Sequence, residues 1–337
     1  MGATFGTKPE EMVDPTRAAF RSVHIYDFNQ SDPHAWRPWI DLTDPVREHP
    51  WIPRDAVFIG KTLTSLAQTL GAARASGLRV LVTWFWGVDP VLPFTGDDVI
   101  VFCLGDELSR KPSYSHDVRL VAKTGGWTRR PSVSIGSIAD LGHVAPATLQ
   151  ELHAQLVRLR SAVSSGARTV RRGRRANYVE IPLAPWSFPS GRAKPMESRR
   201  YDVSFAGSMT NEGQDRRWVL SQKTRSRRKL LTKLERLKRD RHDIQVEIRT
   251  FDSFHDAKHV EGYGDLLMET KLAPCPRGGF RETYRLFEAA ASGCVPITET
   301  LPRRRYYEGC PAVQLRSWSE LIPAVNRLLA DPDGLRR

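Results

Sequence analysis

The sequence predicts an α/β protein with two doubly wound domains that face each other across a cleft. The chain has 337 residues, which is more than a single hydrophobic core usually organises. Continuous apolar segments of strand length alternate with amphipathic helical segments, a pattern typical of parallel sheets that are covered on both faces. A segment rich in proline, serine and glycine interrupts this pattern at residues 186–200, after which the pattern starts again.

Residues 1–185 form the first predicted domain. Its strands are expected at the apolar segments 23–28, 55–60, 77–87, 97–107, 130–138 and 177–184, and its helices at 62–76 and 146–165. In parallel sheets ligands bind beyond the carboxyl ends of the strands. The acidic residues at or after these strand ends are therefore candidate functional groups, namely Asp27, Asp89, Asp106 and Glu107.

Residues 201–337 form the second predicted domain, and residues 186–200 the linker to it. Its strands are expected at 201–208, 244–251, the end of segment 263–276 and 294–298, and segment 312–317 precedes the closing helix. Its helices are expected at 225–243, the start of segment 263–276, from residue 282 or 283 onward, and 318–332. Leucines gather on one face of helix 225–243, and the last helix can pack back on the first domain.

The helix expected in GGFRETYRLFEAAASG, residues 278–293, begins with an unusual combination of residues. The two glycines allow the backbone to approach a ligand closely, and a helix N-terminus favours an anion. Arg281 and Arg285 lie at this positive end of the helix dipole and on one polar stripe with Glu288. A diphosphate would explain the two arginines. The alternative is that Arg285 pairs with Glu282 or Glu288 and has no other role.

The stretch APCPRGGFRETYRLFEAAASGCVPITE resembles the donor-site segment of GT-B glycosyltransferases. It is most similar to the exostosin-like branch, which includes ribitol-xylosyltransferase-type relatives. YDVSFAGSMTNEGQDRR resembles the strand and loop that open the C-terminal domain of that family, VFCLGDE resembles a segment of the N-terminal domain, and SWSELIPAVNRLLADP resembles the closing helix. The resemblance implies a GT-B-like fold of two Rossmann-like domains, with the acceptor on the N-terminal one. It also implies transfer of a sugar from a nucleotide-diphosphate donor to a glycan, lipid-linked or other hydroxyl acceptor.

The same resemblance implies a set of donor-binding residues in the C-terminal domain. Glu288 matches the ribose-binding glutamate, and the glycine loop matches the diphosphate loop. The full set is Gly207, Ser208, Arg277, Gly278, Gly279, Arg281, Thr283, Arg285 and Glu288. Many retaining relatives carry a second glutamate eight residues before the first, but this chain has Phe280 there, which leaves the stereochemical outcome open.

The catalytic groups follow from the chemistry of glycosyl transfer. An inverting enzyme needs a general base for the acceptor hydroxyl, and Asp106 is our first choice, with Glu107 and Asp27 as the other candidates. The alternative for Gly-Asp-Glu at a strand end is a turn with a helix cap. The chain has no convincing Asp-x-Asp motif, and arginines with a helix N-terminus can replace a metal electrostatically. We therefore expect no metal and no cofactor apart from the nucleotide-sugar co-substrate.

The formal net charge of +13 favours polyanionic partners, and arginines gather at 168–175 and 225–241. Helix 225–241 either contacts an anionic membrane surface or leaves its charges in water. Two other functions stay open: a non-enzymatic nucleic-acid or polyanion-binding protein, and a GT-B-fold sugar-nucleotide epimerase or phosphorylase. Nucleic acid is not the expected partner, since no zinc-finger, RRM or KH signature is present.

The expected location is cytoplasmic, with peripheral contact at the inner face of a membrane as an extension. The N-terminal sequence has no apolar core of a signal peptide, and no segment reaches the length of a transmembrane helix. The four cysteines form no C-x-x-C pair, which favours free thiols in a reducing compartment.

Overall fold

The computed structural model describes residues 19–26, 34–38, 55–84, 90–104, 112–124, 163, 177–183, 193–209, 222–251, 262–278, 282–301 and 304–336. These residues fall into two compact units, and the chain passes for the last time from the first to the second between Val179 and Glu180. The first unit holds the described residues up to Lys123 together with residues 177–179, and the second holds Thr124, Val163 and those from residue 180 onward.

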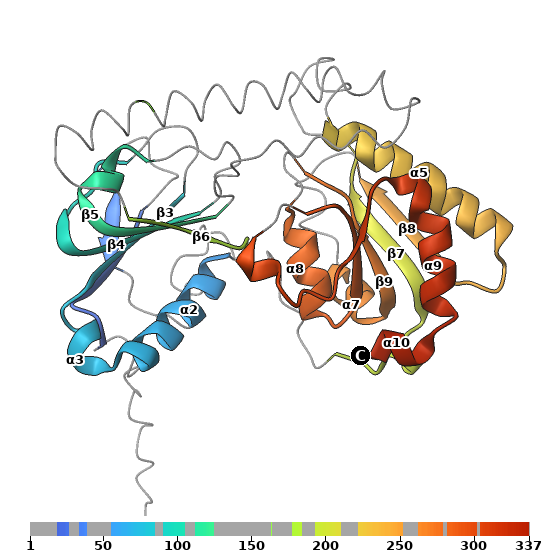
Figure 1. Ribbon diagram of the computed structural model, residues 1–337, viewed down its shortest axis with the longest axis horizontal. Coiled ribbons are helices and arrows are strands. Elements are labelled where there is room, and N and C mark those ends of the chain that lie inside the picture. The colour runs from blue at the N-terminus through green and yellow to red at the C-terminus, as the bar shows by residue number, and fades with distance from the viewer. Residues whose placement is uncertain are drawn as a thin grey trace, which may run out of the picture. The chain divides into compact units, whose positions relative to one another are not determined.

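A six-stranded sheet organises the first unit (Figure 1). Its strands lie in the order β2-β1-β3-β4-β5-β6, and β1, β3, β4 and β5 run parallel, while β2 is antiparallel to β1. The elements are β1 (Ser22–Tyr26), β2 (Trp36–Pro38), α2 (Asp55–Leu70), α3 (Ala72–Ala75), β3 (Arg79–Trp84), β4 (Gly96–Leu104), η2 (Ser113–His116), β5 (Val118–Thr124) and β6 (Tyr178–Ile181). The parallel strands follow one another in sequence order without a reversal, so a doubly wound arrangement of this unit stays a prediction.

The strand expected at residues 55–60 is wrong, because this segment is the first part of helix α2. A short apolar run does not distinguish a strand from a buried helix. The spacing of buried residues over the longer segment identifies a helix, since Ile59, Leu63 and Ala67 repeat every four residues and are all buried. The helix ends before Gly71, whose φ of 76° lies in the left-handed region. The segments expected at 130–138 and 146–165 lie outside the described residues, apart from Val163, which is helical.

The second unit contains a five-stranded parallel sheet in the order β11-β10-β9-β7-β8. Relative to the chain this order is 5-4-3-1-2, the doubly wound order that reverses between the first and third strands. The elements are η4 (Met196–Ser198), β7 (Tyr201–Ser208), α5 (Gln222–Asp240), β8 (Val246–Phe251), α7 (Tyr263–Met268), β9 (Thr270–Cys275), α8 (Tyr284–Ala291), β10 (Val295–Glu299), η6 (Arg305–Tyr307), β11 (Val313–Leu315), η7 (Trp318–Glu320), α9 (Leu321–Leu329) and α10 (Pro332–Arg336). The strands and helices expected from the sequence of this half are confirmed, and β11 and α10 add to them.

Helices cover both faces of this second sheet (Figure 1). Helices α5 and α9 pack on one face, and α7 and α8 pack on the other. Leu230, Leu234 and Leu237 of α5 are fully buried in the first of these layers. Burying each of these side chains contributes about 1.5–3 kcal/mol. The leucine face of α5 is therefore part of the core, as expected for a helix that leaves its charges in water.

The end of the predicted linker is fixed to the second sheet by Arg199, which is buried. Its guanidinium donates to the carbonyl oxygens of Lys194, Thr270 and Ser292 over 2.7–3.1 Å. Adding a side chain at Gly293 would bring a Cβ within 2.7 Å of this guanidinium. Arg199 thus satisfies the carbonyl end of α8 and attaches the chain just before β7.

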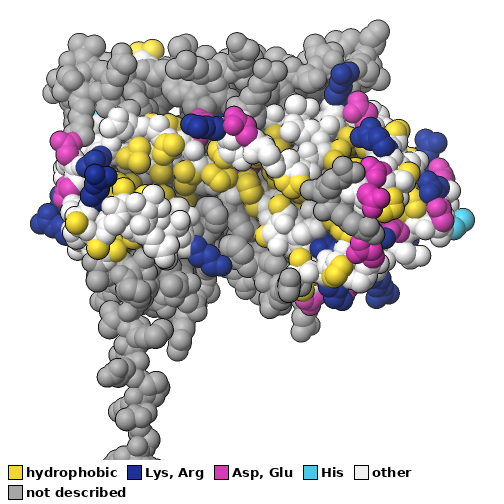
Figure 2. All heavy atoms as spheres, turned by 60° about the horizontal axis from the view of Figure 1, so that its bottom comes forward, with side chains coloured by type: hydrophobic (Ala, Val, Ile, Leu, Met, Phe, Trp, Pro, Cys, Tyr) yellow, Lys and Arg dark blue, Asp and Glu magenta, His cyan; other side chains and the backbone are white. Residues whose placement is uncertain are grey.

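Two expectations for the whole chain can be compared with the described part of the structure. No helix there is long and apolar enough to cross a membrane. All four cysteines are free thiols, as expected. On the face shown in Figure 2, described Lys and Arg side chains are interspersed with Asp and Glu, so this face carries no continuous field of one sign.

Candidate functional site

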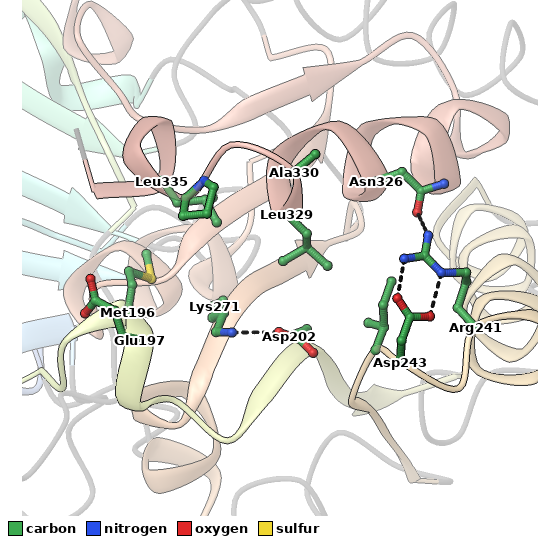
Figure 3. Close-up of a pocket in the computed structure, with 12 residues that line it drawn as sticks. Met196, Glu197, Asp202, Arg241, Asp243, Lys271, Asn326, Leu329, Ala330 and Leu335 are labelled. Atoms are coloured by element: carbon green, nitrogen blue, oxygen red, sulfur yellow. Dashed lines mark hydrogen bonds and ion pairs between the residues drawn. The ribbon is translucent and has the colours of Figure 1, made fainter.

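The amino ends of the second sheet carry a hollow of about 350 Å³, and four of the charged side chains that line it form two ion pairs (Figure 3). Lys271 pairs with Asp202 at 2.7 Å across the starts of β9 and β7. Arg241 forms an ion pair with Asp243 and donates to Asn326, both at 2.6 Å. Because these pairs satisfy one another, they account for the fold at this edge and indicate no ligand.

The carboxyl ends of β7 and β9 form the opposite edge, at the point where the strand order reverses. Gly207 and Ser208 end β7, and Arg277 and Gly278 follow β9 there and are half-buried. Helices α5 and α8 come next in the chain after these two strands, so both begin at this edge. Ligands of doubly wound sheets bind at such a reversal.

Arg285 extends from the first turn of α8 to the end of β7. A Cβ placed on Gly207 would lie 2.8 Å from its Nη2, so only glycine leaves room for the guanidinium in this position. The guanidinium carbon lies 4.7 Å from the ring centroid of Phe205 and 5.6 Å from that of Tyr263. No hydrogen bond or ion pair joins Arg285 to another residue in the described part of the chain. The alternative in which it pairs with Glu282 or Glu288 is therefore wrong.

Glu288 faces the interior and not an open surface. Its side chain is 6% exposed, and it accepts a hydrogen bond of 3.0 Å from the hydroxyl of Tyr263. The polar stripe expected along α8 is thus turned toward the sheet, whereas Ala290 and Ala291 are exposed. Burial raises the pKa of Tyr263 well above its usual value, which keeps the phenol protonated as a donor to Glu288.

Helix α8 begins as the sequence predicts, with Thr283 as its N-cap and extended backbone before it. The Thr283 hydroxyl caps no backbone group, and its buried Oγ1 has no partner among the residues described. The backbone N–H groups of the first turn have no partner within the helix. The N-terminus of α8 therefore presents a polar, positive end at the reversal point.

Arg227 of α5 also lies at this edge, although the sequence predicts for it only a solvated charge of the basic helix. Its Nη1 donates to the carbonyl oxygen of Ser208 and, over 3.1 Å, to the Ser208 hydroxyl. Burial, and then the positive charge of Arg285, lower the pKa of Arg227 to about 9. The leucine period could have identified it, since Arg227 precedes Leu230 by three residues and Leu234 by seven.

Glu282, just before the N-cap, is buried and has hydrogen-bond partners of its own. It accepts hydrogen bonds from the backbone N–H of Leu183 at 2.5 Å and from the Tyr306 hydroxyl at 2.9 Å. Burial raises the pKa of this carboxyl. Its hydrogen bonds fix the backbone that leads into α8, and they leave the carboxylate no role as the counterion of Arg285.

Five predicted site residues, and Asp89, lie outside the described residues. The five are Asp27, Asp106, Glu107, Gly279 and Arg281. The strands that precede the three carboxylates are described: β1 ends at Tyr26, β4 ends at Leu104, and both run parallel to β3 between them. Within the described ranges, no three His, Cys, Asp or Glu side chains gather as a metal site.

The comparison with protein families supports the resemblance given above for part of the chain. Residues 193–327 match the family model described as the RXYLT1 C-terminal domain. This match is 135 residues long and confirms the ribitol-xylosyltransferase-type resemblance for the segment that contains β7 to α9. No curated protein sequence matches the chain.

Solved structures with some similarity include one titled "Crystal structure of GtfA/B complex", at 9% sequence identity and a TM-score of 0.35. The alignment covers 82% of this chain and 57% of that chain, so this chain spans just over half the length of the protein it matches. A similarity at this level carries no argument for a shared mechanism.

Proposed function

We propose that this chain is a glycosyltransferase that takes its sugar from a nucleotide-diphosphate donor. The proposal is supported by the match of residues 193–327 to the RXYLT1 C-terminal domain. It is also supported by the doubly wound order of the second sheet, which creates a ligand-binding edge at β7 and β9. The whole matched segment thus corresponds to the unit that carries this edge.

The observation that carries the proposal is the position of Arg285 against Gly207. A cation at a ligand-binding edge, packed on the rings of Phe205 and Tyr263 and without a counterion among the described side chains, is suited to an anionic group. The N-terminus of α8 supplies a second positive group beside it. In glycosyl transfer the bond from the sugar to the diphosphate breaks, and these groups stabilise the negative charge that develops on the leaving diphosphate.

The remaining parts of the mechanism rest on the sequence prediction. We assign the deprotonation of the acceptor hydroxyl to Asp106, with Glu107 and Asp27 as further candidates. Arg281 and the backbone at Gly278 and Gly279 complete the diphosphate loop in this proposal. Positive groups of the chain replace a divalent metal, so donor binding should persist in the presence of a chelator.

The test is a thermal-shift and calorimetric screen of nucleoside diphosphates and nucleotide sugars with the full chain. Arg285→Met keeps the packing on the two aromatic rings and removes the charge, so we expect donor affinity to fall about 10- to 100-fold. Arg236→Met is the matched control, because it removes an exposed arginine of α5 whose ion pair with Asp240 contributes little. Absence of any response of the wild-type chain to the whole panel would contradict the proposal.

A second readout separates transfer from the other two functions left open. Release of nucleoside diphosphate that depends on an added acceptor favours transfer over an epimerase or phosphorylase. A salt-sensitive affinity for DNA that Arg285→Met does not change would instead favour the polyanion-binding alternative.

A further inference from the structure

Arg227 is an arginine of a surface helix that points to the interior. It lies in the second turn of α5, on the side that carries the buried leucines, and side chains of a helix tilt toward its N-terminus. This direction leads to the carboxyl end of β7, where Nη1 meets the carbonyl and the hydroxyl of Ser208. The guanidinium therefore lies at the same strand end that Arg285 reaches from α8.

The charge of Arg227 is not compensated within the described part of the protein. Both of its hydrogen-bond acceptors belong to Ser208 and are neutral, and its Nε is closed off from solvent without a partner there. The charge that acts most strongly on it is that of Arg285, which has the same sign. A half-buried cation without a counterion carries a desolvation cost, and a second cation beside it increases this cost.

The residue before Arg227, Ser226, already binds the acidic side chain of Glu299 at this edge. Ser226 donates to a carboxylate oxygen of Glu299 at 2.6 Å and accepts from the indole nitrogen of Trp318 at 2.8 Å. Glu299 ends β10, so this network fixes the first turns of α5 on the sheet. It also commits the carboxylate at the end of β10 to Ser226, one position before Arg227.

We propose that Arg227 is a direct phosphate ligand, and that Arg227 and Arg285 together form a two-arginine clamp for a diphosphate group. One guanidinium comes from the helix after β7 and the other from the helix after β9, so the clamp spans the reversal point of the sheet. This inference rests on the proposed donor site and specifies its chemistry. The site requires at least two negative charges, and Arg227 is the residue that makes it prefer a diphosphate to a monophosphate.

The experiment uses the full chain and inorganic pyrophosphate as the probe, with inorganic phosphate as the comparison ligand. Calorimetric titration of the wild type should show tighter binding of pyrophosphate than of phosphate. Arg227→Met should lower the affinity for pyrophosphate by about tenfold or more, and it should lower the affinity for phosphate much less. The ratio of the two affinities is a readout that a purely structural arginine would not change. Arg236→Met, again the exposed arginine of the same helix, should leave both affinities unchanged.

A second variant protects the test against a folding defect. Arg227→Lys keeps a charge of similar reach but loses the fork, so it should bind pyrophosphate more weakly than the wild type and more tightly than Arg227→Met. Equal pyrophosphate affinities for the wild type and a folded Arg227 variant would overturn the clamp. If nucleotide sugars are bound and transferred in that case, the proposed function stands without it. If pyrophosphate binding depends on Arg227 but no nucleotide sugar is transferred, the clamp stands and the proposed function fails.

Discussion

Replacing Gly207 with alanine tests the ligand-binding edge without removing any charged group. The added Cβ would lie 2.8 Å from Nη2 of Arg285 and 3.4 Å from Cζ of Phe205. The first distance is too short, so the guanidinium of Arg285 must leave its position at the end of β7. The second is a tight but tolerable contact. Because the displaced group is the end of a flexible side chain, the backbone of β7 need not move.

The structure predicts a large effect on binding and a small one on stability. Loss of one charge-assisted hydrogen bond to the ligand costs about 1.5–3 kcal/mol, which corresponds to a roughly 10- to 150-fold weaker affinity. The free energy of unfolding should change by less than about 1 kcal/mol, since alanine also restricts the unfolded chain. Gly207→Ala should therefore lower the ligand affinity strongly and change the free energy of unfolding only slightly.

The assay combines calorimetric titration of pyrophosphate and nucleoside diphosphates with unfolding in urea. Gly77→Ala is the matched control, because its Cβ would meet only the carbonyl oxygen of Arg74 at an ordinary 3.6 Å. A Gly207→Ala protein that binds like the wild type would refute the role of Arg285. A loss of several kcal/mol of stability would show instead that Gly207 serves the packing of the sheet.

Two further predictions concern the buried carboxyl groups around α8. Tyr263→Phe removes a hydrogen-bond donor from Glu288, so the free energy of unfolding in urea should fall by about 1–3 kcal/mol, while the ring that supports Arg285, and with it pyrophosphate affinity, is kept. An unchanged unfolding curve would contradict this. Burial raises the pKa of Glu282 above its usual 4.5. At this position the folded chain therefore binds more protons than the unfolded chain. The stability that the protonated Glu282 contributes is lost as the pH rises through its pKa in the folded chain. Glu282→Gln should flatten this decline in melting temperatures measured between about pH 4 and pH 8, and parallel profiles for the two proteins would contradict the assignment.

The second unit was predictable because its signals are long and agree with one another. The leucines of α5 repeat over two turns, and α8 combines a threonine N-cap with a glycine of φ 71° after its end. The first unit was harder to predict. The apolar run at 55–60 is too short to reveal its period, and β5 (Val118–Thr124) was missed although four of its residues in a row are buried.

The site was predictable only where one residue's chemistry decides its role. Arg285 could be identified because a cation at the start of a helix needs an explanation. The interior position of Glu288 depends on Tyr263, a residue 25 positions earlier that reaches it only through the fold. Arg227 was hidden among many similar charges, and only the strand end that it contacts distinguishes it from them.

The two ends of the second sheet give the strongest argument for where this protein acts, because they differ in charge balance and not in composition. At the amino ends, Lys271 and Arg241 each have an acidic partner within 2.7 Å. At the carboxyl ends, the described partners of Arg227 and Arg285 are neutral acceptors and aromatic rings. A fold that pairs its cations at one edge can do so at the other, so the lack of an acidic partner for Arg227 and Arg285 among the described residues supports a ligand at the carboxyl edge. An anion with two charged groups would complete it.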